Sequence, residues 1–267
     1  MTTVNIPDFS IEQIANSGQC FRINKSNEVR GTSCAWEVKA LGKGLIIQQN
    51  PNMTHTFDCP VHDYCNKWTN YFDVNRDYAE IKRRILERKD PYLTRAVEYG
   101  WGLRILKQDP WEIIVSFIIS QRTSIPRIKT LIEKLCHDKD FPSPEKLDEL
   151  SEADLSAMGF GYRAKYIRSI VTAVLNGDLN IEFAKRLDTR SFVEYFTRFD
   201  GIGPKVAHCI ALFGFHKIDA FPRDVWVNRV IDERYSGKFS LEGLEDVAGI
   251  VQQYMFFYER YLQKESK

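Results

Sequence analysis

The sequence contains no long hydrophobic run. Its unbroken apolar stretches, such as residues 113–115 and 117–119, are far shorter than the roughly 20 residues of a membrane-spanning helix. The opening residues, MTTVNIPDFS, lack the charged and then apolar pattern of a secretory leader, so we expect no secretion. Internal repeats, low-complexity segments and flexible linkers are also missing. With 267 residues, of which 43% are hydrophobic and 27% charged, we expect a globular protein of one or two domains.

Cysteine is sparse as well. The six cysteines are scattered at positions 20, 34, 59, 65, 136 and 209, whereas a disulfide scaffold is shorter and denser in cysteine, so we expect reduced thiols inside a cell. Four possible metal ligands, His55, Cys59, His62 and Cys65, lie within eleven residues, but their spacing matches no familiar zinc finger or ribbon. We predict no metal there and leave open whether the cluster binds anything.

The first seventy-odd residues and the rest of the chain have different hydrophobic periods. Short alternating or apolar runs at 19–23, 35–40 and 45–49 are broken by Asn, Gly and Ser clusters, which predicts a small antiparallel sheet. Gly42 and Gly44, on either side of Lys43, indicate a tight hairpin. From Tyr78 onward the period is helical.

Seven prolines punctuate the helical part, and several of them fit the first turn of a helix. We predict helices at roughly 78–88, 91–99, 110–119, 124–136, 144–157, 162–175, 181–198, 204–214, 224–234 and 241–263. The predicted fold class is therefore α+β, with an N-terminal antiparallel sheet domain at 1–76 and a larger helical domain at 77–267.

The most informative segment is TRFDGIGPKVAHCIALF, at 197–213, in which a glycine-rich turn separates two predicted helices. Gly201 and Gly203 let the backbone turn sharply and approach a ligand closely. The amides of the turn, at the positive end of the helix that Pro204 begins, form a cradle for an anion such as a DNA phosphate, with room for a bridging cation. A plain joint between two helices is the alternative interpretation of the same pattern.

Two further residues indicate that the protein can form a Schiff base. Lys205 lies in the first helical turn, where the dipole disfavours a positive charge, and we expect this placement with partial burial to lower its pKa. A neutral lysine amine is a suitable nucleophile. Asp224, in FPRDVWV, precedes an apolar helical pattern and is predicted to be its N-cap, ionised and held in place. A surface lysine and a simple cap are the alternative interpretations.

These residues belong to a pattern that resembles the helix-hairpin-helix DNA glycosylases with a Gly/Pro-rich loop and aspartate, and more narrowly the 8-oxoguanine DNA glycosylases. The resemblance spans nearly the whole chain, because five further blocks follow in the same order: SGQCFRI (17–23), YFDVNRDY (71–78), GLRILKQDPWEIIVSFIIS (102–120), GFGYRAKYI (159–167) and QQYMFFYERYL (252–262). It implies a bifunctional glycosylase and β-lyase that acts on 8-oxoguanine in duplex DNA as part of base excision repair.

The resemblance also implies roles for single residues. Lys205 matches the nucleophile that attacks the deoxyribose C1′, and Asp224 matches the carboxylate that assists it. The damaged base must first be flipped out of the duplex, because C1′ cannot be reached inside the stack. Gly18 matches the glycine whose carbonyl accepts a hydrogen bond from N7–H of 8-oxoguanine, a donor that guanine lacks.

Further matches concern the flipped base and the DNA around it. Cys209 and Phe257 match the pair that sandwiches the base, and Gln253 matches the amide that reads its Watson–Crick edge. Core packing is the alternative for the sandwich pair, and an ordinary strand or bulge glycine is the alternative for Gly18. Among the residues matched to DNA contacts, Tyr162 matches a wedge, and Arg163 and Arg127 match readers of the opposite base. Trp226 stands where eukaryotic members have a phosphate-binding histidine, and residues 122–124 replace their asparagine run.

With 37 basic and 36 acidic residues the net charge is +1, so any DNA-binding surface must come from local clusters. Basic side chains gather at three predicted helix starts: Arg122, Arg127 and Lys129; Arg163, Lys165 and Arg168; and Lys205. The resemblance implies no organic cofactor, and the absence of a cysteine-rich tail implies no iron–sulfur cluster. We expect a monomer that binds damaged duplex DNA and no membrane, located in the cytoplasm or nucleoid, or in the nucleus of a eukaryote.

Two rival functions remain open at this stage. The same fold acting on alkylated bases or other oxidised bases is one, and Gly18 with its SGQCFRI block argues against it. A DNA-damage binding module without catalytic activity is the other, and the combination of Lys205 with Asp224 argues against that.

Overall fold

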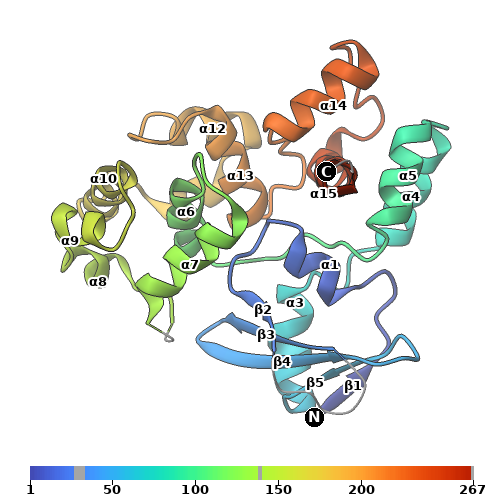
Figure 1. Ribbon diagram of the computed structural model, residues 1–267, viewed down its shortest axis with the longest axis horizontal. Helices are drawn as coiled ribbons and strands as arrows, with labels where there is room; N and C mark the ends of the chain where they lie inside the picture. Colours follow the sequence, from blue (N-terminus) through green and yellow to red (C-terminus); the bar gives the residue numbers. More distant parts are fainter. Residues whose placement is uncertain (27–33, 138–139, 266–267) are drawn as a thin grey trace.

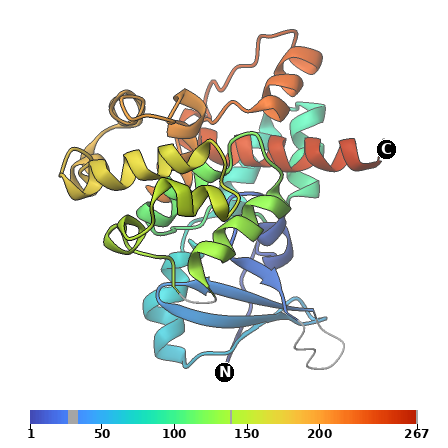
Figure 2. The same cartoon turned by 60° about the vertical axis from the view of Figure 1, so that its left-hand side comes forward.

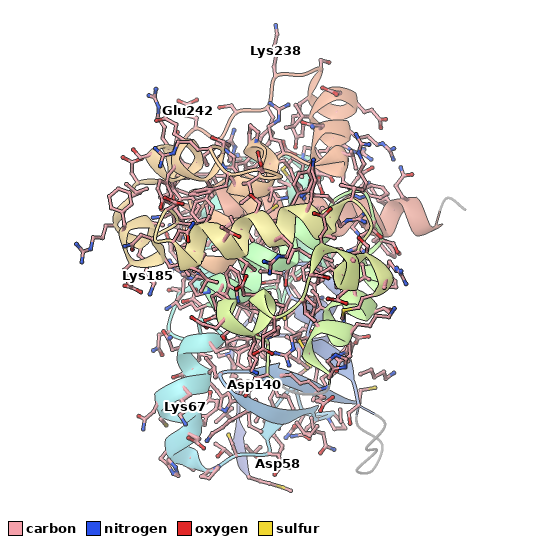
Figure 3. The ribbon with its side chains drawn as sticks, turned by 90° about the vertical axis from the view of Figure 1, so that its left-hand side faces the viewer. Asp58, Lys67, Asp140, Lys185, Lys238 and Glu242 are labelled. Atoms are coloured by element: carbon pink, nitrogen blue, oxygen red, sulfur yellow. The ribbon has the colours of Figure 1, made fainter. Side chains whose placement is uncertain are left out.

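The computed structural model describes residues 1–26, 34–137 and 140–265. A sheet lies at one end of the molecule and a larger helical body at the other (Figure 1). In Figure 3 the labelled Asp58 and Lys67 mark the sheet end, whereas Lys238 and Glu242 mark the opposite end. This arrangement confirms the predicted α+β fold class. None of the helices in these described ranges is long and apolar enough to cross a membrane.

The sheet has five antiparallel strands in the order β1-β5-β4-β3-β2: β1 (Thr2–Val4), β2 (Ile23–Lys25), β3 (Ala35–Ala40), β4 (Lys43–Gln49) and β5 (His55–Phe57). The predicted hairpin is confirmed: Ala40 pairs with Lys43, and Leu41 and Gly42 between them have φ angles of 57° and 68°. The predicted strand at 19–23 is wrong, because strand structure begins only at Ile23 and the preceding residues form a turn.

Short helices also lie within the first 76 residues, and the sequence analysis missed them: α1 (Ile11–Asn16), α2 (Val61–Asp63), the π-helical turn η1 (Tyr64–Trp68) and α3 (Thr69–Tyr71). Together with the sheet they enclose a small core that includes Phe9, Trp36, Phe57 and Trp68. Helix α1 lies between the sheet and the helical body in Figure 1.

The helical body is built from helices that begin where the sequence supplies a cap. Asp90 and Asp109 accept hydrogen bonds from the first amides of α5 and α6, and proline occupies the first turn of α5, α6, α7, α8 and α13. The bounds are α4 (Tyr78–Glu87), α5 (Pro91–Tyr99), α6 (Pro110–Ile119), α7 (Ile125–Cys136), α8 (Pro144–Asp148), α9 (Glu152–Ala157), α10 (Arg163–Leu175), α11 (Ile181–Arg186), α12 (Thr189–Phe196), α13 (Pro204–Gly214), α14 (Val225–Tyr235), η2 (Glu245–Val247) and α15 (Ala248–Glu265).

Two of the predicted helices are in fact broken in the middle. The segment 144–157 forms α8 and α9, because Ser151 and Asp154 make a capping box that starts a new helix. The segment 181–198 forms α11 and α12, because Asp188 accepts a hydrogen bond from the amide of Ser191. In both cases a local side chain satisfies the amides of a new first turn.

The extended segment at 102–109, between α5 and α6, contacts both parts of the molecule. Arg104 in this segment is buried and donates to the carbonyl oxygens of Pro7 and Asp8, at 2.6 and 3.0 Å, and to that of Asp73, at 2.7 Å. Beyond it, α6 is buried against α13, and α15 runs across the body towards the C-terminus (Figure 2). Residues of α6, α13 and α15 line the site described below.

The His55 cluster does not assemble into a metal site in the described ranges, where no group of three His, Cys, Asp or Glu side chains is placed to hold an ion. The His55 ring is fully buried against Phe9, and burial lowers its pKa to about 4. Cys59 is buried, whereas Cys65 is exposed.

Candidate active site

A cleft of about 780 Å³ opens between the Ser17–Gly18 turn, the loop after α6, and helices α13, α14 and α15. Six of the predicted site residues line it: Gly18, Lys205, Cys209, Asp224, Trp226 and Gln253. They come from four separate segments of the chain: the residues after α1, helix α13, the start of α14, and α15.

Lys205 lies in the first turn of α13, with Nζ 5.6 Å from the centre of the Phe117 ring. The predicted lowering of its pKa is wrong. The negative charge that Cys209 can carry raises the pKa of Lys205, Asp224 adds to this, and burial opposes it. In the unbound protein Lys205 is therefore an ammonium group, and it must lose a proton before its nitrogen can act as a nucleophile.

Asp224 is the N-cap of α14, as the sequence predicts. Its Oδ1 accepts hydrogen bonds from the amides of Trp226 and Val227, at 3.0 and 2.9 Å. Burial raises the pKa of Asp224, while the two amides and Lys205 oppose the shift. A carboxylate with a raised pKa next to an ammonium group is suited to accepting a proton from it.

Gly18 has a φ of 79°, in the left-handed region that favours glycine. A Cβ built on it would lie 3.0 Å from Cδ1 of Ile125 and 3.2 Å from Cε1 of Phe256. The backbone of Gly18 therefore approaches an aromatic ring on α15 without an intervening side chain.

Of the two adjacent phenylalanines on α15, Phe256 lines the cleft, and the predicted Phe257 does not. Phe256 lines the cleft beside Gly18, with the Arg260 guanidinium 5.2 Å from its ring centre. Phe257 is buried on another side of α15, against Tyr99 at a ring-centre distance of 5.1 Å. Consecutive helical residues point about 100° apart, so an assignment shifted by one residue selects a side chain that belongs to the core.

Both glutamines at the start of the QQYMFFYERYL block line the cleft. The predicted reader, Gln253, already uses its Nε2 to donate to the carbonyl oxygen of Ser17, at 2.7 Å. Oε1 of its neighbour Gln252 is buried and accepts no hydrogen bond from any residue in the described ranges. A buried amide oxygen in this state favours a ligand that donates a hydrogen bond.

The hairpin formed by α12, α13 and the loop between them contains two glycines whose surroundings differ. Gly201 has a φ of 80°, and a Cβ on it would lie 2.4 Å from Cγ of Tyr166. Gly203 is exposed, and a Cβ on it would meet nothing within 4 Å. The close approach at Gly201 is internal to the fold, whereas Gly203 leaves open space at the start of α13.

Gln121, which the sequence analysis missed, joins three segments predicted to contact DNA. Its side chain donates to the carbonyl oxygen of Gly201, at 2.9 Å. Its own carbonyl oxygen accepts hydrogen bonds from Tyr162 and Arg163 at the start of α10. No motif in the sequence marks this residue, because these three partners are 41 to 80 positions away.

The predicted basic clusters are only partly available to a ligand. Arg122 and Arg127 are exposed. The Arg127 guanidinium lies close to the backbone of Gly159, because a Cβ on Gly159 would be 2.7 Å from its Nη2. Lys129, in contrast, donates to Ile23 and Asn24 of β2, and Arg168 donates to backbone carbonyls in the last turn of α8 and just after it.

The residues matched to a wedge and to nearby DNA contacts differ in exposure. Tyr162 is 47% exposed, as a wedge requires. Arg163, at 9%, is buried with its guanidinium 4.7 Å from the Tyr162 ring centre, so in this conformation it supports the tyrosine and does not reach solvent. Trp226 is half-buried on the rim of the cleft, beside Arg229.

Comparison with known proteins places this chain in a family. Residues 1–114 match the family model described as the N-terminal domain of 8-oxoguanine DNA glycosylase, and residues 115–240 match that of the HhH-GPD superfamily of base excision DNA repair proteins. The solved structure of the Clostridium acetobutylicum 8-oxoguanine glycosylase/lyase, with double-stranded DNA that has cytosine opposite 8-oxoG, is 33% identical. The match covers 96% of this chain and 93% of that one, with a TM-score of 0.86. The chain belongs to the 8-oxoguanine DNA glycosylase family.

Two other relatives agree with this membership. The structure of MBOgg1 in complex with a low-affinity DNA ligand is 32% identical, covers 98% of this chain and 96% of that one, and has a TM-score of 0.89. A probable N-glycosylase/DNA lyase of Methanothermobacter thermautotrophicus is 26% identical, with 96% of this chain and 95% of that protein aligned. The family resemblance inferred from the sequence blocks is therefore confirmed, whereas the roles of single residues in the cleft stay predictions.

Proposed function

We propose that this protein is a bifunctional DNA glycosylase and β-lyase that removes 8-oxoguanine from duplex DNA in base excision repair. The observation that carries the proposal is the meeting of Lys205, Asp224 and the Gly18 backbone in one cleft. Family membership and the names of the relatives support the same activity. The cleft volume of about 780 Å³ has room for a flipped nucleotide.

The proposed reaction begins when Lys205 loses its proton, for which the Asp224 carboxylate is the acceptor in the cleft. The neutral amine attacks C1′, a C1′–N bond to the lysine forms, and the bond from C1′ to the base breaks with its electron pair leaving on the base. The departing base takes up the proton held by Asp224. A proton then passes from the lysine nitrogen to the ring oxygen O4′, the C1′–O4′ bond breaks, and a protonated Schiff base forms. Removal of a proton from C2′ expels the 3′ phosphate and cleaves the strand.

Recognition of the lesion relies on the free backbone of Gly18. The oxidised base carries a hydrogen on N7, and a carbonyl oxygen accepts it, whereas guanine would bring an acceptor against an acceptor. An unmade buried hydrogen bond of this kind costs about 1–3 kcal/mol. Phe256 and Cys209 offer apolar surfaces for the two faces of the base, and Oε1 of Gln252 is free to accept a hydrogen bond from its edge.

The DNA backbone is proposed to bind at the start of α13. The amides after Gly203 and the helix dipole suit a phosphate, and a cation bridging the hairpin to that phosphate is part of the proposal. Arg127, Tyr162 and Trp226 lie on the neighbouring segments and are proposed to contact the duplex. We propose that the enzyme acts as a monomer, without an organic cofactor or an iron–sulfur cluster, where the cell keeps its DNA.

Borohydride trapping tests this function directly. A duplex with one 8-oxoguanine opposite each of the four bases is incubated with the protein and borohydride, beside an undamaged duplex and a duplex with a preformed abasic site. We expect a covalent complex with the lesion and the abasic site, and none with undamaged DNA or with Lys205→Gln. Trapping only on the abasic duplex would retain the lyase and overturn the base assignment. No complex with either would overturn both.

A further inference from the structure

The three consecutive carbonyl groups of Ser17, Gly18 and Gln19, in the turn after α1, differ in the hydrogen bonds that they accept. The Ser17 oxygen accepts a hydrogen bond from Nε2 of Gln253 at 2.7 Å, and the Gln19 oxygen accepts one from Nε2 of Gln108 at 2.9 Å. The Gly18 oxygen between them accepts none from the residues that the structure describes. Gly18 lines the cleft, so the one of these three carbonyl groups that accepts no hydrogen bond from the described residues belongs to a residue of the cleft wall.

The side chain of Gln19 also holds this turn in place through hydrogen bonds. The Gln19 carboxamide is fully buried and donates to the Arg104 carbonyl oxygen at 2.9 Å, while accepting a hydrogen bond from the Leu106 amide at 2.9 Å. It also donates to the Ser17 hydroxyl at 2.9 Å. The turn is thereby tied to the extended segment 102–109, and the position of Gly18 depends on that segment.

Gln108 belongs to this segment and reaches in two directions. Besides the Gln19 oxygen, its Nε2 lies 3.4 Å from the carbonyl oxygen of Phe213, near the end of α13. Helix α13 also carries Lys205 and Cys209, and the Phe213 ring stacks on Phe117 beneath the lysine. With 8% of its surface exposed, Gln108 is a buried link between the turn that holds Gly18 and the helix that holds the nucleophile.

We propose that Gln108 is a positioning residue for lesion selectivity, which holds the Gly18 carbonyl at a fixed place relative to Lys205. This inference rests on the proposed function. A hydrogen bond to N7–H weakens steeply when its acceptor is displaced or misaligned, and recognition needs its groups held within about 0.5 Å. Loss of the Gln108 donor leaves the Gln19 carbonyl without its partner and frees the turn to shift.

The substitution Gln108→Met removes the donor and keeps a side chain of similar length. We expect release of 8-oxoguanine under single-turnover conditions to fall about ten- to a hundredfold, the range for one lost hydrogen bond to the base. Strand cleavage at a preformed abasic site involves no base, so its rate should stay within about twofold of the unmodified protein. The ratio of these two rates separates positioning from a general loss of structure, which lowers both.

Gln13→Met is the matched control. Gln13 also ties two segments together, donating to the Tyr99 carbonyl oxygen at 2.9 Å and accepting from the Gly102 amide at 2.7 Å, but it does not line the cleft. It should lower thermal stability without changing the ratio of the two rates. Gln108→Glu keeps the shape of the side chain and serves if the methionine variant does not fold; it should change the ratio in the same direction.

The outcomes separate the two proposals. If the unmodified protein releases no 8-oxoguanine, the proposed function is wrong. If it does, but the folded Gln108 variants lower both rates in proportion or leave the ratio unchanged, the positioning role is overturned and the proposed function stands.

Discussion

The charge states of two side chains one helical turn apart, Lys205 and Cys209, depend on each other. Cys209 raises the pKa of Lys205, and burial raises the pKa of the Cys209 thiol. The lysine is therefore protonated at neutral pH in the unbound protein. The reaction must remove this proton, and its rate should follow the fraction of neutral amine.

The variant Cys209→Ala tests this coupling. It removes the group that raises the pKa of Lys205 and leaves the burial that lowers it, so the pKa should fall. Below its pKa the amine is protonated and the trapping rate rises with pH, so the rising limb of the profile should move to lower pH. Trapping on a preformed abasic duplex between about pH 8 and 10.5, where a buried thiol and amine of raised pKa begin to lose their protons, measures the shift. An unchanged limb, or one moved to higher pH, contradicts the coupling.

The adjacent residues Phe256 and Phe257 on α15 allow a test of which side chain contacts the flipped base. Phe256→Ala should reduce 8-oxoguanine release about ten- to a hundredfold through lost base stacking, with little change in cleavage at an abasic site. Phe257→Ala should instead lower the free energy of unfolding by about 3–5 kcal/mol, because it empties a core position against Tyr99. Denaturant titration and single-turnover rates distinguish the two. The reverse pattern would restore Phe257 as the residue of the cleft.

Among the elements, the hairpin of α12 and α13 combines a structural glycine with an open one. Gly201 has a positive φ and lies against Tyr166, while its carbonyl accepts from Gln121. Gly203 has an ordinary φ of −85° and open space around its Cα. The same motif thus holds one glycine for the fold and one at the proposed phosphate site.

Substituting each glycine by alanine distinguishes the structural role of Gly201 from the proposed phosphate-binding role of Gly203. Gly201→Ala should destabilise the protein by about 2–4 kcal/mol, from overpacking together with a strained φ. Gly203→Ala should lower stability by no more than about 1 kcal/mol, because Gly203 is the N-cap of α13, and it should weaken binding to duplex DNA, because its methyl group enters the space proposed for a phosphate. Melting curves and binding titrations at one fixed salt concentration give both values. Equal DNA affinity for Gly203→Ala and the unmodified protein would move the phosphate contact elsewhere.

For the whole molecule, the extended segment 102–109 joins the small sheet core to the helical core. Arg104 bonds to carbonyls from Pro7, Asp8 and Asp73 and stacks on Tyr78, at 4.5 Å from its ring centre. Leu106 packs in the small core, whereas its neighbour Ile105 packs in the large one. The two parts should therefore unfold together.

Arg104→Met tests this cooperativity. Loss of the guanidinium leaves three carbonyl groups without their donor, and we expect a loss of about 3–5 kcal/mol in the free energy of unfolding. In a protein whose other tryptophans, Trp101, Trp111 and Trp226, are replaced by phenylalanine, the fluorescence of Trp36 and Trp68 in the small core should report the same single transition as helical circular dichroism. Two separated transitions in that protein would contradict a common unfolding unit.

The sequence by itself determined the fold class, the hairpin at Lys43, most helix starts and the family, because caps, prolines and ordered motifs act over a few residues. It also predicted Lys205 and Asp224 as site residues, and both line the cleft. Only the tertiary structure decided that Phe256 faces the cleft, since two adjacent apolar residues on a buried helix have no local signal to separate them. The raised pKa of Lys205 and the links made by Gln108 and Gln121 were likewise decided there, because each depends on groups that only folding brings together.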